Sequence, residues 1–187
     1  LLLVVAAFLD LALAIFVLVR RKSDLTARSF STVALTIGIW TLAITLFRMD
    51  SRPYWELMWN RLFIFSSALI ASSLVIFSRS LCDKKTSSLG LFLIQIPTLV
   101  VLMGVFQPDA LIRRIIYHPW GKESILGQYY WIFAIYFFAY LLYSTVILWR
   151  TYLKSKGNYK VQIAYVLSTT VIAGGIGTVF NLIFILL

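Results

Sequence analysis

The sequence predicts an all-α protein that folds as a polytopic bundle of transmembrane helices, and three observations predict it. Hydrophobic residues make up 61% of the 187 residues, and a single globular core in water would leave many of them exposed. These residues gather in six apolar spans, each about long enough to cross a hydrocarbon core of about 30 Å as a helix. Lysine and arginine lie mainly between the spans and are densest in every second connection.

The spans follow one another along the whole chain. In order they cover residues 1–19, 30–47, 57–77, 87–106, 129–149 and 161–187. The connections after the first, third and fifth spans hold about ten residues each. Such short connections make sequence neighbours antiparallel neighbours in space. We therefore predict one transmembrane domain over residues 1–187, with six helices.

The basic residues predict the orientation of these helices. Eleven of the 17 lysines and arginines follow spans one, three and five, whereas six follow spans two and four or begin span three. Basic loops stay in the cytoplasm, so the first group is expected inside and the start of the chain outside. The formal charge of +10 is therefore concentrated at the inner membrane surface, where it favours anionic lipid head groups rather than a nucleic-acid partner.

The first span holds the one acid predicted to lie inside the membrane. It lacks a basic leading region and a small-residue cleavage site, so it differs from a secretory signal peptide. Asp10 lies ten residues before Arg20 at the inner edge, at a depth of about 15 Å. It either forms part of a site for a proton, cation or polar ligand, or is a buried acid held by polar neighbours. Gln95 in span four lies at a similar depth and is placed to hydrogen-bond to it.

Aromatic residues mark the outer interface before span three, where Tyr54, Trp55 and Trp59 precede the apolar run. Arg61 follows at a height of about 24 Å above the inner end of that span. Two interpretations remain open for Arg61. It contacts a ligand, or it extends to the outer interface beside Asn60.

The longest connection joins spans four and five, and it lies outside in the predicted topology. It covers residues 107–128 and follows a span in which Pro97 is expected to kink the helix. Residues 110–117 place several isoleucines and a leucine on one helical face. They are expected to form either a short amphipathic helix on the membrane surface or a plain interfacial segment.

Span five carries a stripe of aromatic side chains at helical spacing, namely Tyr129, Phe133, Tyr136, Tyr140 and Tyr143. Rings in this arrangement pack against neighbouring helices, or they line a cavity for an apolar or amphipathic ligand. In the second case Tyr136 and Tyr140 would supply the polar contacts.

Small residues four positions apart predict close helix packing in spans three and six. Ser67 and Ala71 form such a pair in span three, and in span six Gly174 pairs with Thr178 and Gly177 with Ala173. Small residues at these spacings let two helix backbones approach each other, within one bundle or between protomers.

Residues for catalysis and metal binding do not occur in workable arrangements. His118 is the one histidine, and it lies beside Pro119 in the outer connection, so a metal cluster or a histidine-assisted nucleophile cannot be built. The glycines at 174–177 lie in a span and do not form a phosphate-binding loop. Cys82 is a lone cytoplasmic cysteine, either unmodified or S-palmitoylated. We predict no enzymatic activity, no cofactor and no metal within these residues.

A set of landmark residues is distributed along the whole chain, namely Trp40, Trp59-Asn60-Arg61-Leu62, Phe77, Ile96-Pro97, Gln162-Ile163-Ala164-Tyr165, Gly174-Gly175 and Asn181. In these residues the chain resembles the N-terminal seven-transmembrane sensor region of bacterial membrane histidine kinases. The resemblance implies seven helices in the bacterial cytoplasmic membrane and a cytoplasmic kinase or similar output after the last helix. The chain would then be truncated after the sixth helix. Span three departs from the family pattern at Ser66-Ser67-Ala68.

The predicted function is a membrane-embedded sensor that passes a ligand- or membrane-induced helix rearrangement to a cytoplasmic output domain. The candidate ligand-binding residues are Asp10, Gln95, Arg61, Tyr136 and Tyr140. The expected partners are the lipid bilayer, a small apolar or amphipathic ligand and a second copy of the full-length protein. A small multi-pass transporter or channel is the main alternative, with Asp10 and Gln95 on a permeation path. A membrane anchor without a ligand is a third possibility.

Overall fold

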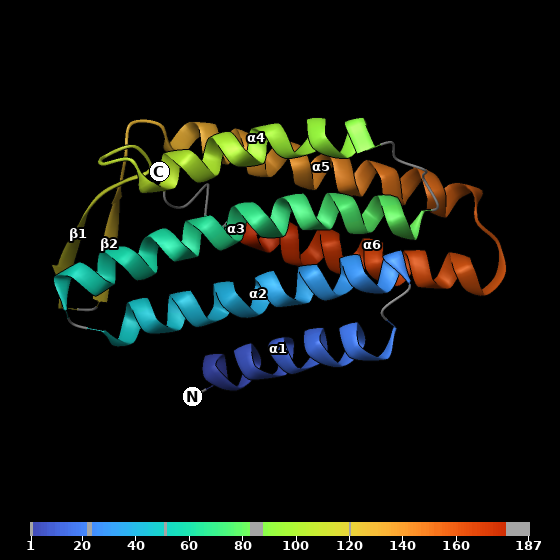
Figure 1. Cartoon of the computed structure of the whole chain (residues 1–187), viewed down its shortest axis with the longest axis horizontal. Coiled ribbons are helices and arrows are strands. Elements are labelled where there is room, and N and C mark those ends of the chain that lie inside the picture. The colour runs from blue at the N-terminus through green and yellow to red at the C-terminus, as the bar shows by residue number, and fades with distance from the viewer. Residues whose placement is uncertain (1, 22–23, 51, 83–87, 120, 179–187) are drawn as a thin grey trace.

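The computed structural model describes residues 2–21, 24–50, 52–82, 88–119 and 121–178. In chain order the elements are α1 (Leu2–Arg20), α2 (Leu25–Met49), α3 (Pro53–Leu81), α4 (Ser88–Phe106), β1 (Ile112–His118), β2 (Gly121–Leu126), α5 (Tyr130–Lys154) and α6 (Gly157–Thr178). The six helices lie along one common axis, with successive helices antiparallel, and the two strands lie at one end of the bundle (Figure 1). The predicted all-α transmembrane bundle is confirmed.

Each predicted span contains one helix, and most helices extend beyond the apolar run into polar sequence. For example, α2 begins at Leu25 because the Asp24 carboxylate accepts a hydrogen bond of 2.9 Å from the backbone N–H of Thr26. Pro53 begins α3 in the first turn, where a missing N–H has no cost. Residues 179–187 of the sixth predicted span lie outside the described residues.

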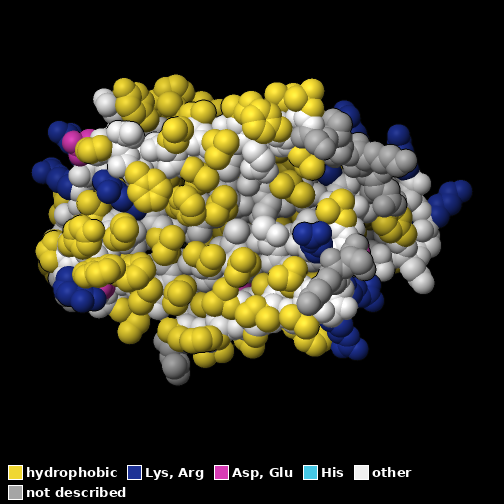
Figure 2. Space-filling model, in the orientation of Figure 1, with side chains coloured by type: hydrophobic (Ala, Val, Ile, Leu, Met, Phe, Trp, Pro, Cys, Tyr) yellow, Lys and Arg dark blue, Asp and Glu magenta, His cyan; other side chains and the backbone are white. Residues whose placement is uncertain are grey.

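Within the described residues, α1 to α5 are long and apolar enough to cross a membrane. Apolar side chains cover the middle of the bundle, and lysine and arginine side chains gather toward its two ends (Figure 2). Many large apolar side chains on α1, α4 and α5 are exposed, including Phe8, Leu99 and Ile135. A surface of this kind is suited to contact with lipid tails.

Helix α3 is the centre of the bundle. It packs against α2, α4 and α5, while α1 packs against α2 and α6 packs against α5. Its small residues Ala68 and Ala71 are buried in a core cluster, together with side chains of α4, β1 and α5. Ser67 is buried on the same helix, and its hydroxyl bonds the Phe63 carbonyl at 2.8 Å rather than another helix.

Close approach of helices elsewhere also depends on small residues. A Cβ on Gly38 of α2 would lie 2.9 Å from the Leu11 side chain of α1. A Cβ on Gly174 of α6 would lie 2.5 Å from the Leu141 side chain of α5. A larger residue at either position would therefore require the facing leucine side chain to move.

The connections divide the two ends of the bundle into distinct surfaces. The ends of α1, α3 and α5 and the starts of α2, α4 and α6 lie at one end of the bundle, which we call the basic end (Figure 1). The strands lie at the opposite end with the end of α2 and the start of α3, and we call it the hairpin end. At the basic end Tyr159 of α6 donates a hydrogen bond of 2.7 Å to the Leu81 carbonyl at the end of α3.

The connection between α4 and α5 forms a β-hairpin, so the prediction of an amphipathic helix at 110–117 is wrong. Strands β1 and β2 pair antiparallel, with His118 opposite Gly121 beside the turn. Gly121 has a φ of +152°, a conformation that other residues rarely adopt. Residues 121–126 follow the turn and supply a partner strand for residues 112–118, which include three β-branched isoleucines. This pairing favours a strand over a helix.

Candidate functional site

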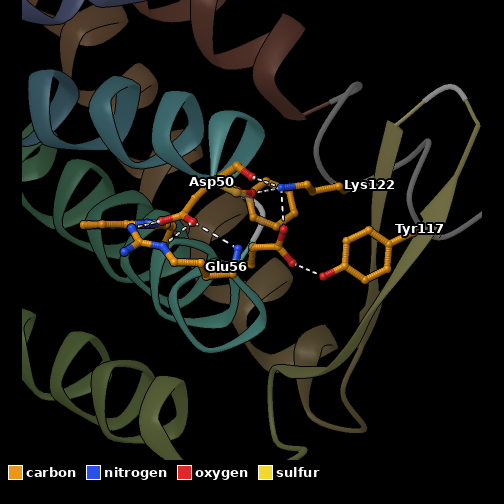
Figure 3. A network of polar contacts seen from close by, with 7 residues as sticks. Asp50, Glu56, Tyr117 and Lys122 are labelled. Atoms are coloured by element: carbon orange, nitrogen blue, oxygen red, sulfur yellow. Dashed lines mark hydrogen bonds and ion pairs between the residues drawn. The ribbon is translucent and has the colours of Figure 1, made fainter.

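A carboxylate is fully buried at the hairpin end. Glu56 lies in the first turn of α3 and has an exposed fraction of 0%. Its Oε1 lies 2.5 Å from the Nζ of Lys122 on β2, and its Oε2 accepts a hydrogen bond from the Tyr117 hydroxyl on β1 (Figure 3). Tyr117 and Lys122 are directly opposite each other in the hairpin, so both side chains reach the same face. The register of the hairpin thus brings two donors to one carboxylate.

The Lys122 ammonium also holds the end of α2. It donates to the Phe47 carbonyl at 3.1 Å and to the Asp50 carbonyl. Together with the ion pair to Glu56, these contacts place three oxygen atoms around the ammonium. Carbonyl groups at a helix C-terminus carry partial negative charge, so the cation is suited to this position. A single side chain therefore joins the hairpin to the end of α2 and the start of α3.

Asp50 fixes the turn between α2 and α3. Its carboxylate accepts hydrogen bonds from the Arg52 guanidinium at 2.8 and 2.9 Å, from the Arg52 backbone N–H at 3.0 Å and from the Trp59 indole at 3.2 Å. The side-chain hydrogen bond from Arg52 is the main cause that holds the pKa of Asp50 well below its ordinary value. Asp50 is therefore a charged C-cap of α2 whose carboxylate is held by Arg52 and Trp59.

A pocket of about 530 Å³ lies beside this network, between α2, α3 and β2. We call it the hairpin pocket, and its lining residues are Ile44, Phe47, Arg48, Asn60, Phe63, Gly121, Lys122 and Ser124. Asn60 donates to the Ser124 hydroxyl at 2.5 Å, so the pocket wall is also a contact between α3 and β2. The volume is within the range of small-molecule sites.

The hairpin pocket has a positive lining. Arg48 and Lys122 are its charged residues, and none of the lining residues is acidic. Lys122 is neutralised by Glu56, whereas Arg48 is exposed and has no hydrogen-bond or ion-pair partner among the described residues. The pocket therefore presents one uncompensated cation. Within the same described part of the chain, no group of three His, Cys, Asp or Glu side chains could hold a metal ion.

The structure does not bring Asp10 and Gln95 together. Asp10 lies on α1 and Gln95 on α4, at opposite sides of the bundle with α2 and α3 between them (Figure 1). Both side chains are half-buried, and no hydrogen bond joins them. Among the described residues, Asp10 has no hydrogen-bond or ion-pair partner. The ligand-binding roles of both residues stay predictions.

Tyr136 and Tyr140 lie together in the middle of the bundle, with their ring centroids 4.4 Å apart. The Tyr136 hydroxyl is 2.9 Å from the Thr98 hydroxyl of α4 and donates to the Ala68 carbonyl of α3 at 2.8 Å. The Tyr140 hydroxyl donates to the Ile94 carbonyl of α4. These contacts join α5 to α3 and α4, and neither tyrosine lines the hairpin pocket.

Arg61 lies one residue beyond Asn60 but on another face of α3. Its helical spacing places it with Leu57 and Ile64, which contact the core cluster shared with α4 and α5. The side chain is half-buried, and its Nε is buried without a hydrogen-bond partner among the described residues. Its predicted ligand contact is therefore separate from the hairpin pocket.

Sequence reasoning missed Glu56, Tyr117 and Lys122. Glu56 precedes the apolar run of the third predicted span, whereas α3 begins at Pro53 and includes Glu56 in its first turn. Tyr117 and Lys122 lie opposite each other only in a hairpin. The available signal was Pro119 followed by Gly121, which is typical of a turn between two strands.

Comparison with known proteins gives one match. The family model described as the N-terminal 7TM region of histidine kinase matches residues 2–186. No curated protein and no solved structure matches the chain. The match covers nearly the whole chain and confirms the resemblance found in the sequence.

Proposed function

We propose a function from the premise that the chain belongs to the family of N-terminal 7TM regions of histidine kinases. The proposal is that it receives a signal at the hairpin end and passes it, as a helix rearrangement, to a cytoplasmic output domain. The observation that carries this proposal is a pocket of about 530 Å³ whose wall includes Lys122, the side chain that holds the hairpin, α2 and α3 together.

The distribution of charge supports the proposed direction of the signal. Eleven of the 17 lysines and arginines lie in the three connections at the basic end or in the helix ends beside them, which favours a cytoplasmic position for that end. The hairpin end would then face the outside of a bacterial cytoplasmic membrane. A ligand from outside or from the outer leaflet would reach the hairpin pocket without crossing the membrane.

The proposed coupling begins at Lys122. A ligand can shift a conformational equilibrium only when it binds the two conformations unequally. A ligand that contacts Lys122 competes with Glu56 and with the carbonyl groups at the end of α2 for the same ammonium. Because α3 packs against α2, α4 and α5, a shift at its first turn would reach most of the bundle. The output would respond through a dimer of the full-length protein.

The test compares output activity in the full-length protein, measured as autophosphorylation in membranes. The double variant Glu56→Gln/Lys122→Gln removes the ion pair without leaving one buried charge alone. We expect it to change the basal autophosphorylation several-fold, at equal amounts of inserted protein. The control is Lys156→Gln, an exposed residue at the basic end, which should leave it unchanged. Equal autophosphorylation in the double variant and the wild type would remove the basis of the proposal.

A small transporter or channel is the second candidate, and one observation favours it. The Asp10 carboxylate is half-buried within α1 and has no partner among the described residues, as expected for a group that binds a passing cation. In proteoliposomes, this function predicts cation flux that Asp10→Asn abolishes. The sensor predicts no flux above that of empty liposomes.

A further inference from the structure

We infer that the hairpin pocket binds an amphiphile with an anionic head group and a short apolar chain. This inference rests on the proposed function, because it names the ligand class of the same site. It follows from three features of the pocket, which are the charge of its lining, the order of polar and apolar residues along the bundle, and the space left at the turn.

The charge of the lining selects the head group. Arg48 has no ion-pair partner among the described residues, and Asn60 and Ser124 place amide and hydroxyl groups on the same wall. A carboxylate could accept two parallel hydrogen bonds from the Arg48 guanidinium. A neutral head group would displace water from the Arg48 guanidinium and would supply no negative charge to offset the lost hydration. Such an exchange is unfavourable. The buried Glu56 carboxylate pairs with Lys122, so it offsets the charge of Lys122 and leaves that of Arg48 unpaired among the described residues.

The order of residues along the helices selects an amphiphile. Ile44 precedes Arg48 by four residues on α2, and Phe63 follows Asn60 by three residues on α3. Because α2 runs toward the hairpin end and α3 runs away from it, both apolar side chains lie about 5 Å deeper in the bundle than the polar ones. The head group would thus lie at the hairpin end and the chain would point toward the membrane interior.

The apolar wall continues beyond the pocket. The Phe63 ring packs against Trp40 of α2, with centroids 5.5 Å apart, and Trp40 lies two helical turns below Arg48. At the opposite side, a Cβ on Gly121 would meet no atom within 4 Å, so the turn of the hairpin leaves open space at the head-group end. An acyl chain would therefore contact Phe47, Ile44 and Phe63 in turn.

The test uses decanoate as the anionic probe and decanol as its neutral equivalent. Binding of radiolabelled decanoate is measured with the full-length protein in phosphatidylcholine nanodiscs, after subtraction of empty nanodiscs. We expect saturable binding that unlabelled decanoate displaces at a concentration at least tenfold lower than decanol. Displacement by both compounds at the same concentration would overturn the anionic head group.

Variants locate the site. Arg48→Gln is expected to weaken decanoate binding about tenfold, and Ile44→Trp, which fills the apolar wall, should also weaken it. The matched control is Arg114→Gln, which removes the same charge from an exposed position on β1 outside the pocket. Binding that survives Arg48→Gln, or that falls equally in Arg114→Gln, would overturn the assignment to this pocket. Circular dichroism shows whether each variant is folded.

Two further arms separate the sources of ligand and the two proposals. Nanodiscs containing phosphatidylglycerol supply an anionic lipid; competition with decanoate supports a lipid of the leaflet as the ligand, and absence of competition supports a free amphiphile. If decanoate does not bind but Glu56→Gln/Lys122→Gln still changes autophosphorylation, the ligand class is wrong and the sensor function stands. If decanoate binds but that variant has normal autophosphorylation, the pocket is not the input of the signal.

Discussion

At the residue scale, the ion pair between Glu56 and Lys122 joins the start of α3 to the hairpin around a fully buried carboxylate. Glu56 is fully buried, so removal of its partner leaves an uncompensated charge away from water. We expect Lys122→Met to lower the free energy of unfolding by about 3–5 kcal/mol. In the double variant Glu56→Gln/Lys122→Met no charge is left alone, so most of this loss should be recovered.

Unfolding by denaturant in detergent micelles measures these differences as a double-mutant cycle. Lys156→Met serves as the control for loss of one exposed positive charge at the basic end. A double variant that is no more stable than Lys122→Met would show that the ammonium acts through the α2 carbonyls rather than through Glu56.

A second prediction at this scale concerns pH and Asp50. The hydrogen bonds from Arg52 lower the pKa of Asp50 in the folded state, so its stabilising effect is present above the ordinary pKa of about 3.9 and is lost as the pH falls toward the folded value. The difference in melting temperature between the wild type and Asp50→Asn should be constant from pH 7 to about pH 5 and shrink below about pH 4. A difference that stays the same down to pH 3 would contradict this cause.

At the element scale, the hairpin depends on close backbone contact at its base. Gly127 donates a hydrogen bond of 3.0 Å to the Leu111 carbonyl, and a Cβ at this position would overlap the backbone carbonyl of Ala110. Backbone atoms cannot rotate away as a side chain can. Gly127→Ala should therefore lower the melting temperature and expose the hairpin to limited proteolysis, at a cost of about 1–3 kcal/mol.

The chain offers a matched control for this substitution. A Cβ on Gly175 of α6 would meet no atom within 4 Å, so Gly175→Ala should leave both the melting temperature and the protease pattern of the hairpin unchanged. Equal sensitivity of the hairpin in both variants would show that the clash at Ala110 is relieved by a small backbone shift.

The elements differ in how far the sequence could predict them. The helices could be predicted because an apolar run of sufficient length has one stable structure in a bilayer, with all backbone hydrogen bonds inside the segment. The hairpin could not, because the isoleucines among residues 112–116 suit one face of either a helix or a strand, and pairing with 121–126 decides between them. The contacts of Glu56 depend on that pairing. The site could therefore not be predicted without the hairpin. The affinity of the basic end for anionic lipid head groups, by contrast, is an expectation that rests on charge alone.

At the scale of the whole molecule, two ends of different charge and structure share one bundle. The hairpin end has a pocket and a network of polar contacts around the buried Glu56, and the basic end has three short connections rich in lysine and arginine. The proposed sensor can carry a signal across the membrane only if the two ends of the bundle face different compartments. The orientation of the bundle is therefore the property on which the sensor function depends most directly.

This orientation can be tested with single cysteines in a Cys82→Ser background. Arg114→Cys lies on the exposed face of β1, and Lys156→Cys lies between α5 and α6 at the basic end. Because basic connections stay in the cytoplasm, a membrane-impermeant maleimide should label Arg114→Cys in intact cells and Lys156→Cys only after the membrane is opened. The reverse pattern would place the hairpin pocket in the cytoplasm, where an outside ligand could not reach it. The same pattern would also put the output on the wrong side of the bundle.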